Sequence, residues 1–293
     1  MTYKSGPHFL QIPGPSHVPD RILRAIGQPT IDHRGPEFQT LANEVLAKVK
    51  PIFQTECPVV ILPSSGTGAW EAALVNTMNV GDKVLMFETG QFSSLWAELA
   101  TRLGLQPEVI PGDWRHGVDA AAIEARLLED KGHEIKAVCV VHNETSTGVT
   151  SKIQKVRKAI DAANHPALFM VDSISGLGSA EYKHDEWGVD VTVSGSQKGL
   201  MLPPGLGFNA VGPKALKASE NARINRSYWD WKSQIGMNKD GWFPYTPATN
   251  LLYGLNEACD MMMEEGLDNV FSRHERFAEA TRRAVRTWGL EVL

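Results

Sequence analysis

Short apolar runs of strand length recur along this chain, and longer, mostly helical patterns separate them. They lie at residues 59–62, 84–87, 137–141, 167–171 and 191–193. Strands that alternate with helical segments of about ten residues or more predict βαβ units, a parallel sheet and right-handed crossovers. We therefore expect an α/β fold in which a mainly parallel sheet lies between helices.

Composition and charge indicate a globular protein and argue against nucleic-acid-binding and membrane proteins. The chain has 293 residues, 42% of them hydrophobic and 22% charged, which is ordinary for a globular protein. The net charge of −5 and the lack of a Lys/Arg-rich block argue against a nucleic-acid surface. No apolar run approaches the about 18 residues that cross a membrane, and the first residues lack a secretory signal. We expect a cytoplasmic protein that binds neither nucleic acid nor membrane.

The three cysteines are Cys57, Cys139 and Cys259. They are far apart in the sequence and show neither the CxxC pattern nor the Cys/His spacing that is typical of a metal site. We therefore expect buried, reduced thiols and no metal ion.

Small residues follow the apolar run at 59–62. The segment at 64–68 reads S-S-G-T-G and continues into a helical pattern. The first N–H groups of a helix have no partner within the helix, and the helix dipole favours an anion there. Thr67, Gly68 and Ala69 are therefore candidates for binding a phosphate. A tight structural turn explains the same residues, because the segment lacks the lysine of a P-loop and the GxGxxG spacing.

A carboxylate and a lysine follow two other runs. Asp172 comes directly after the run at 167–171, and the segment V-T-V-S-G-S-Q-K-G at 191–199 places Lys198 just beyond the last run. Ligands of parallel sheets bind beyond the carboxyl ends of the strands, which is where each of these motifs lies. A phosphate cradle, a carboxylate and a lysine at one edge are what pyridoxal 5′-phosphate requires.

Each of the two polar side chains has a chemical role in this interpretation. Lys198 would form a Schiff base with the cofactor and would then move a proton as a general base. Asp172 would keep the pyridine nitrogen protonated, so that the ring accepts electrons. An alternative role for Asp172 is to cap the following turn through Ser173 and Ser175.

Three further residues are candidates for cofactor contacts. Gln197 adjoins the lysine and would donate to the phosphate. Thr145 lies in the polar segment at 142–148, whose hydroxyl and amide groups suit a ring substituent or a phosphate. Phe92 begins a helical pattern and would stack on the ring, although packing in the core explains it equally.

Aromatic residues and prolines concentrate at 228–231 and 242–247. Aromatic side chains are enriched at contacts between chains, which favours a subunit interface here. Packing beneath a long loop is the alternative. Amphipathic helices are expected to follow at 251–263 and 270–288.

Together these motifs resemble the class V, fold type I aminotransferases, and within them the serine–glyoxylate and alanine–glyoxylate group. The resemblance extends from about residue 13 to the end of the chain. It rests on S-G-T-G at 65–68, H-N-E-T-S-T-G at 142–148, V-D-S at 171–173, S-G-S-Q-K-G at 194–199 and P-P-G at 203–205. The segment I-D-H-R-G-P-E-F at 31–38 is similar to the bacterial members.

The resemblance implies a transaminase that moves an amino group from a small amino acid, of the serine or alanine type, to glyoxylate. It also implies a homodimer whose active site lies at the interface, with Tyr245 and Thr246 reaching the phosphate across that interface. The implied domains are an N-terminal extended segment at 1–18, a large cofactor-binding domain at 19–262 and the start of a small C-terminal α+β domain at 263–293.

Two features depart from this family. Relatives often have Trp where Phe92 stands. They also continue into a complete small domain that carries an arginine for the substrate carboxylate, and this arginine cannot be assigned here. We therefore expect the chain to be a fragment, and a shortened relative of the family is the alternative.

Two other functions remain open at this point. A cysteine desulfurase or lyase on the same fold needs a nucleophilic cysteine in an exposed Gly/Ser-rich loop, and none of the three cysteines lies in such a loop. A catalytically silent dimerisation or binding protein of the same fold is the second alternative. The Lys198→Ala variant separates enzyme from scaffold, because only the enzyme would lose both its cofactor absorbance and its turnover.

Overall fold

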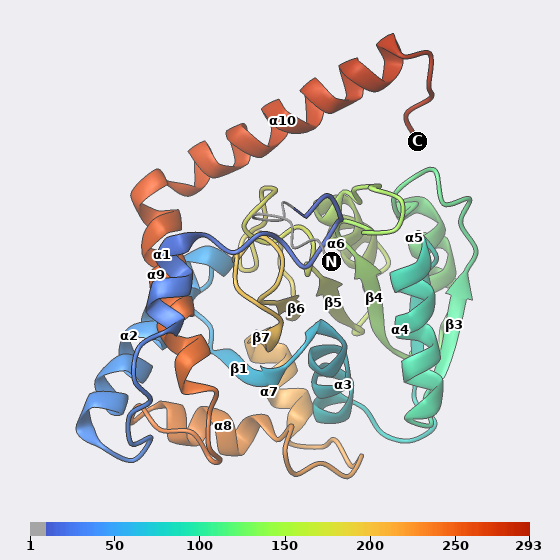
Figure 1. The fold of residues 1–293 in the computed structure, drawn as a ribbon. Helices are drawn as coiled ribbons and strands as arrows, with labels where there is room; N and C mark the ends of the chain where they lie inside the picture. The colour runs from blue at the N-terminus through green and yellow to red at the C-terminus, as the bar shows by residue number, and fades with distance from the viewer. Residues whose placement is uncertain (1–9) are drawn as a thin grey trace, which may run out of the picture.

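A central sheet organises the computed structural model, which describes residues 10–293. Within these residues seven strands form one sheet in the order β1-β7-β6-β5-β4-β2-β3 (Figure 1). The adjacent strands β3, β2, β4, β5 and β6 are parallel to one another, whereas β7 is antiparallel to both β1 and β6. The strands are β1 (Val59–Ser64), β2 (Lys83–Phe87), β3 (Gln106–Ile110), β4 (Ile135–Val141), β5 (Leu168–Asp172), β6 (Val191–Gly195) and β7 (Gly205–Val211). The expected α/β fold with a mainly parallel sheet is confirmed.

Helices cover both faces of the sheet. One apolar core lies between the sheet and α2, α5, α6 and α9, and a second core lies between the sheet and α3, α4 and α7. The helices are α1 (Asp20–Ile26), α2 (Pro36–Phe53), α3 (Gly66–Thr77), α4 (Gln91–Arg102), α5 (Ala120–Glu129), α6 (Ile153–Ala162), α7 (Pro213–Ser219), α8 (Trp231–Asn238), α9 (Thr249–Glu265) and α10 (Leu267–Thr287).

The continuous apolar runs became central strands because both of their faces are covered. All residues of β5 and β6 are buried, as is expected for parallel strands between two helical layers. Asp172 ends β5, and Lys198 lies in the turn after β6. The order of the sheet therefore places both residues at the same edge.

One strand, β7, was not predicted. Its sequence, G-L-G-F-N-A-V, contains two glycines and an asparagine, which disfavour a strand on local preference. Pairing with β1 and β6 on either side overrides that preference. Gly207 is needed there because a Cβ atom would lie 2.7 Å from the Ser65 carbonyl oxygen.

The aromatic segment is only partly a surface loop. Trp231 begins α8 and is buried, and Phe243 is buried against α2, so the packing explanation holds for these two residues. Tyr228 is exposed and stacks on Tyr245 with ring centroids 4.2 Å apart. The prediction of a subunit interface therefore applies to these two tyrosines, where it stays a prediction.

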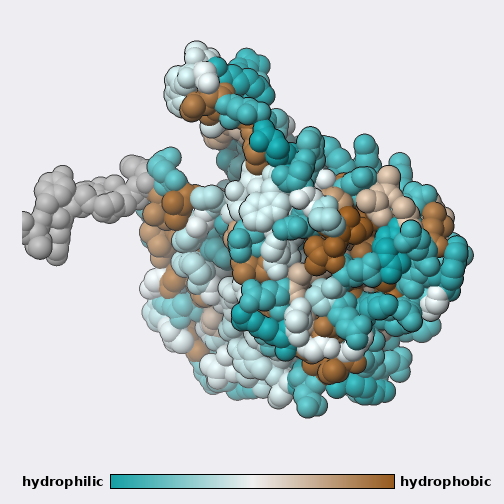
Figure 2. Space-filling model, turned by 90° about the vertical axis from the view of Figure 1, so that its right-hand side faces the viewer, coloured by the Kyte–Doolittle hydropathy of each residue, from teal (hydrophilic) through white to brown (hydrophobic). Residues whose placement is uncertain are grey.

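Helix α10 stands outside the main body (Figures 1 and 2). Val270 is its one buried residue. The domain boundary expected after residue 262 lies within the last turn of α9, and the part of the expected N-terminal segment at 1–9 lies outside the described residues. Each helix of residues 10–293 is too short or too polar to cross a lipid bilayer.

Candidate active site

A cavity of about 250 Å³ opens at the carboxyl ends of β4, β5 and β6. Its walls come from the turns after β1, β4, β5 and β6, from the start of α3 and α4, and from the N-terminal segment. Six of the residues predicted from the sequence line it, and they are Thr67, Phe92, Thr145, Asp172, Gln197 and Lys198. The fold thus brings together side chains that are far apart along the chain.

Four predicted residues do not line this cavity. Gly68 and Ala69 lie one step further along α3, where a Cβ atom on Gly68 would lie 2.0 Å from Ser64 Oγ and Ala69 is fully buried. Tyr245 lies in the loop after α8, where it stacks on Tyr228 and accepts a hydrogen bond from the Gln234 amide. Thr246 adjoins Tyr245 and is likewise absent from the cavity wall.

Asp172 is a buried carboxylate held by two hydrogen bonds. Its Oδ2 accepts from Trp70 Nε1 at 2.9 Å, and its Oδ1 accepts from the Ile174 backbone N–H at 2.7 Å. Burial raises the pKa of Asp172 to about 7, against the effect of these two donors, and the carboxylate of Glu144 adds to the rise. A cation placed against this carboxylate would stabilise its charged form.

Lys198 lies half-buried across the same cavity. Its Nζ donates to the Pro13 carbonyl at 2.8 Å, and burial lowers the pKa of this amine while the charge of Asp172 opposes the shift. The N-terminal segment is fixed over the lysine, because Ser16 donates through its N–H to Gln197 O and through its hydroxyl to Lys198 O. A lowered pKa increases the fraction of neutral, nucleophilic amine.

The start of α3 provides the third part of the site. Ser65, the residue before the helix, makes no side-chain capping bond, so no side chain covers the first N–H groups of α3 in this way. A Cβ atom on Gly66 would lie 2.2 Å from Ile174 Cδ1, so glycine lets the helix begin against this side chain without displacing it. Uncapped N–H groups at a helix start favour a bound anion.

The wall of the cavity includes an aromatic group whose position is fixed by a buried carboxylate. Glu144 is fully buried, and its two oxygens accept from the N–H groups of Phe92 and Ser93 at 3.2 Å each. Trp70 contacts Phe92 edge to face and stacks on Trp96 with ring centroids 5.7 Å apart. Phe92 is thus held at the cavity from both its backbone and its ring.

Sequence reasoning missed several residues of this site. Trp70 lies just past the glycines of α3, and its aromatic character was the available signal. Glu144 and Asn143 lie within the polar segment at 142–148, but nothing local shows that Glu144 turns inward to cap α4. Gly14 and Pro15 line the cavity, although the sequence indicated only a rigid turn there.

Comparisons with known proteins agree with this arrangement. A family model described as aminotransferase class-V matches residues 9–290. The serine–glyoxylate aminotransferase of Methylorubrum extorquens is 52% identical over an alignment of 297 positions, which covers 99% of this chain and 74% of that protein. The L-aspartate–glyoxylate aminotransferase of Paracoccus denitrificans is 47% identical, with 96% of this chain and 71% of that protein covered.

A solved structure shows the same fold. The crystal structure of an alanine–glyoxylate aminotransferase from Nostoc sp. superimposes with a TM-score of 0.90 at 28% identity. The superposition covers 99% of this chain and 75% of the Nostoc chain.

Proposed function

The chain belongs to the class-V aminotransferase family, and on that premise we propose that it transfers an amino group from a small amino acid to glyoxylate. Its cofactor is pyridoxal 5′-phosphate, and its fold is fold type I. Relatives are named for serine, aspartate and alanine as partners of glyoxylate. The observation that carries the proposal is the single cavity shared by Asp172, Lys198 and the uncapped start of α3.

The residues of the cavity fit this cofactor. Asp172 is a buried carboxylate without a cationic hydrogen-bond partner among the described residues, and a protonated pyridine nitrogen would supply one. The start of α3 and Thr67 would hold the phosphate. Gln197 Oε1 is buried and has no hydrogen-bond partner within residues 10–293, so its amide is free to turn its NH2 group toward an anion.

When bound, the cofactor supplies an aldehyde that carries the amino group and a ring that accepts electrons. Asp172 would hold a proton on the ring nitrogen, and its hydrogen bonds from Trp70 and Ile174 orient the carboxylate. Lys198 Nζ would take the proton from the α carbon of the amino donor and, in the second half-reaction, would deliver a proton to the α carbon of the acceptor, because burial leaves a larger fraction of this amine neutral. Phe92 and Trp70 would exclude water from one wall.

The attachment of the cofactor to Lys198 through a Schiff base is part of this proposal. Reduction with borohydride would fix the cofactor on one peptide, and mass spectrometry would identify the lysine. We expect the label on Lys198. A label on another lysine would contradict the assignment.

The subunit and domain arrangement is also proposed. Exposed Tyr228 and its stacking partner Tyr245 lie near the surface, which supports a homodimer in which Tyr245 and Thr246 serve the partner's site. Sedimentation would measure the mass, and a monomer at working concentration would contradict this. The domain division at 18 and 262 and a cytoplasmic location remain predictions, and limited proteolysis and cell fractionation would test them.

The decisive experiment is a panel of amino donors assayed with glyoxylate. We expect serine or alanine to convert the bound cofactor to its amino form and glyoxylate to restore it, with turnover lost by at least about a hundredfold in Lys198→Ala. Full turnover in that variant would refute the proposal. The desulfurase alternative gains no support, because none of the three cysteines, all within the described residues, lines the cavity.

A further inference from the structure

A second group of side chains of the types that bind metals lies at the amino ends of strands β1 and β6, on the side of the sheet opposite to the cofactor cavity. Cys57 precedes β1, and His184 and Asp185 lie in the loop before β6. One ligand atom from each of the three residues lies within 4.8 Å of the other two. The amino ends of β1 and β6 meet here, whereas the cofactor cavity opens at their carboxyl ends.

His184 is the central observation. Its side chain is 1% exposed, and its Nε2 has no hydrogen-bond partner among residues 10–293. The nearest carboxylate oxygen, Asp185 Oδ1, lies 4.0 Å from Nε2, which is too far for a hydrogen bond. A buried polar nitrogen without a partner is costly, so a ligand at this position would remove a penalty.

The other ring nitrogen of His184, Nδ1, is held by a hydrogen bond to Thr192. Nδ1 lies 2.7 Å from Thr192 Oγ1, and the Tyr182 hydroxyl lies 2.6 Å from the same oxygen. With Nδ1–H donating to Thr192, Nε2 carries a lone pair directed toward Cys57 and Asp185.

Asp185 is held in place and keeps free lone pairs. Its Oδ1 accepts from Thr55 Oγ1 at 2.6 Å and its Oδ2 accepts from the Glu56 N–H at 2.9 Å. A carboxylate offers about four lone-pair positions, so two remain for a cation. The Cys57 N–H donates to Thr55 Oγ1, which places the thiol beside the same carboxylate.

The backbone around the cluster is already organised. The N–H of His184 donates to Phe53 O at 3.1 Å, and the N–H of Asp185 donates to Gln54 O at 3.4 Å. Tetrahedral zinc, with bonds of about 2.0–2.3 Å, holds its ligand atoms about 3.3–3.7 Å apart. The present separations, of up to 4.8 Å, exceed these distances, so the side chains must move closer together when the metal binds.

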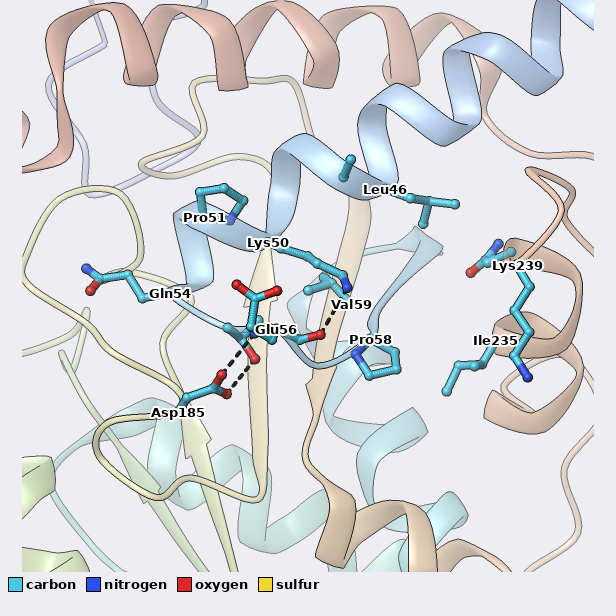
Figure 3. Close-up of a pocket in the computed structure, with 13 residues that line it drawn as sticks. Leu46, Lys50, Pro51, Gln54, Glu56, Pro58, Val59, Asp185, Ile235 and Lys239 are labelled. Carbon is cyan, nitrogen blue, oxygen red and sulfur yellow. Dashed lines mark hydrogen bonds between the residues drawn. The ribbon is translucent and has the colours of Figure 1, made fainter.

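The cluster has a route to solvent. Asp185, Thr55 and Glu56 line a surface pocket of about 790 Å³ beneath the end of α2. Figure 3 shows the Asp185 carboxylate bonded to the segment that carries Glu56, with Lys50 bonded to the Glu56 carbonyl from the other side. Of the three proposed ligands, Asp185 lines this pocket and Cys57 and His184 do not, so a cation would approach the cluster through Asp185.

We propose that Cys57, His184 and Asp185 form a binding site for Zn²⁺, which ties the start of β1 to the loop before β6. Sulfur, imidazole and carboxylate are the ligand types of zinc, and three protein ligands leave the fourth position to water. Sequence reasoning predicted no metal ion and missed this group, because its members come from two distant segments.

The test uses the cofactor-loaded protein after treatment with a chelator. Calorimetric titration with Zn²⁺ alone should give one site per chain, and Co²⁺ should produce the absorption band of a cobalt–thiolate bond. Cys57→Ala should remove the band and weaken Zn²⁺ binding by at least about 100-fold, beyond the about 10–100-fold cost of losing an outer-shell partner. Cys259→Ala is the matched control, since this thiol is buried within the α9 packing, and it should behave as the parent protein.

A second variant guards against misfolding. Asp185→Asn keeps one oxygen that can accept from the Glu56 N–H, and its NH2 group can donate to Thr55 Oγ1. It loses the negative charge and should weaken Zn²⁺ binding while the circular dichroism spectrum is unchanged. Equal Zn²⁺ binding by the parent protein and Cys57→Ala, or a Co²⁺ complex without the thiolate band, would overturn the proposal. Binding only at millimolar Zn²⁺ would overturn it as well.

Discussion

The hydrogen bond from Trp70 Nε1 to Asp172 Oδ2 controls how easily the buried carboxylate ionises. Trp70→Phe removes the donor and keeps an aromatic ring in the stack. A hydrogen bond to a charged group contributes about 1.5–3 kcal/mol. At about 1.36 kcal/mol per pKa unit, its loss should raise the pKa of Asp172 by about one to two units. The starting value is about 7, so the variant's carboxyl should titrate at about 8–9.

This shift has a defined effect on cofactor affinity. In the proposed site, Asp172 pairs as a carboxylate with a protonated pyridine nitrogen. Below the pKa of Asp172, the cofactor-free protein must therefore give up the Asp172 proton when it binds a cofactor that is already protonated on that nitrogen. The parent protein should therefore lose affinity as the pH falls below about 7. Trp70→Phe should bind the cofactor about 10–100-fold more weakly than the parent below about pH 7, and nearly as tightly above about pH 10.

Trp96→Phe is the matched control. Trp96 is buried in the same stack, but its Nε1 has no hydrogen-bond partner within the described part of the chain. Its replacement makes the same truncation without losing a bond to Asp172. Cofactor titration followed by visible absorbance across the pH range measures both variants. A Trp70→Phe defect that is equal to that of Trp96→Phe, or that does not depend on pH, would refute the reasoning.

Two predictions concern stability. Gly236→Ala should stabilise the protein by about 0.5–1 kcal/mol, because Gly236 lies within α8 and a Cβ atom there meets nothing within 4 Å; an unchanged or lower urea midpoint would contradict this. Asp119→Ala should destabilise it by about 0.5–2 kcal/mol, because Asp119 caps α5 by accepting from the Ala121 N–H. Urea unfolding with an unchanged slope would measure this loss, and a midpoint equal to that of the parent protein would contradict it.

The parts of the fold that could be predicted are those in which local pattern and tertiary environment agree. The residues of β5 are apolar up to Asp172 because both faces of that strand are buried, so the run could be recognised without knowing its neighbours. Strand β7 could not be recognised in this way. Gly207 is explained by the Ser65 carbonyl, which lies on another element and is invisible in the local sequence.

The residues of the candidate site likewise fall into those that the local sequence predicts and those that it does not. Lys198, Asp172 and Thr67 follow strands directly, so the rule that ligands bind at strand ends was sufficient to bring them together. Glu144 and Trp70 act through contacts with other elements. Glu144 caps α4, and Trp70 donates a hydrogen bond to Asp172. The group of Cys57 and His184 was missed for the same reason, because no spacing rule connects two loops that meet only in the folded chain.

The N-terminal segment lies directly on Lys198, the lysine proposed to be catalytic. Pro13 accepts from Lys198 Nζ, and Ser16 is tied to the backbone of Gln197 and Lys198. Removing residues up to Ser16, or adding an affinity tag close to them, therefore changes the surroundings of the reactive amine. Protein chemists who engineer this end of the molecule should expect altered kinetics even when the body of the enzyme is untouched.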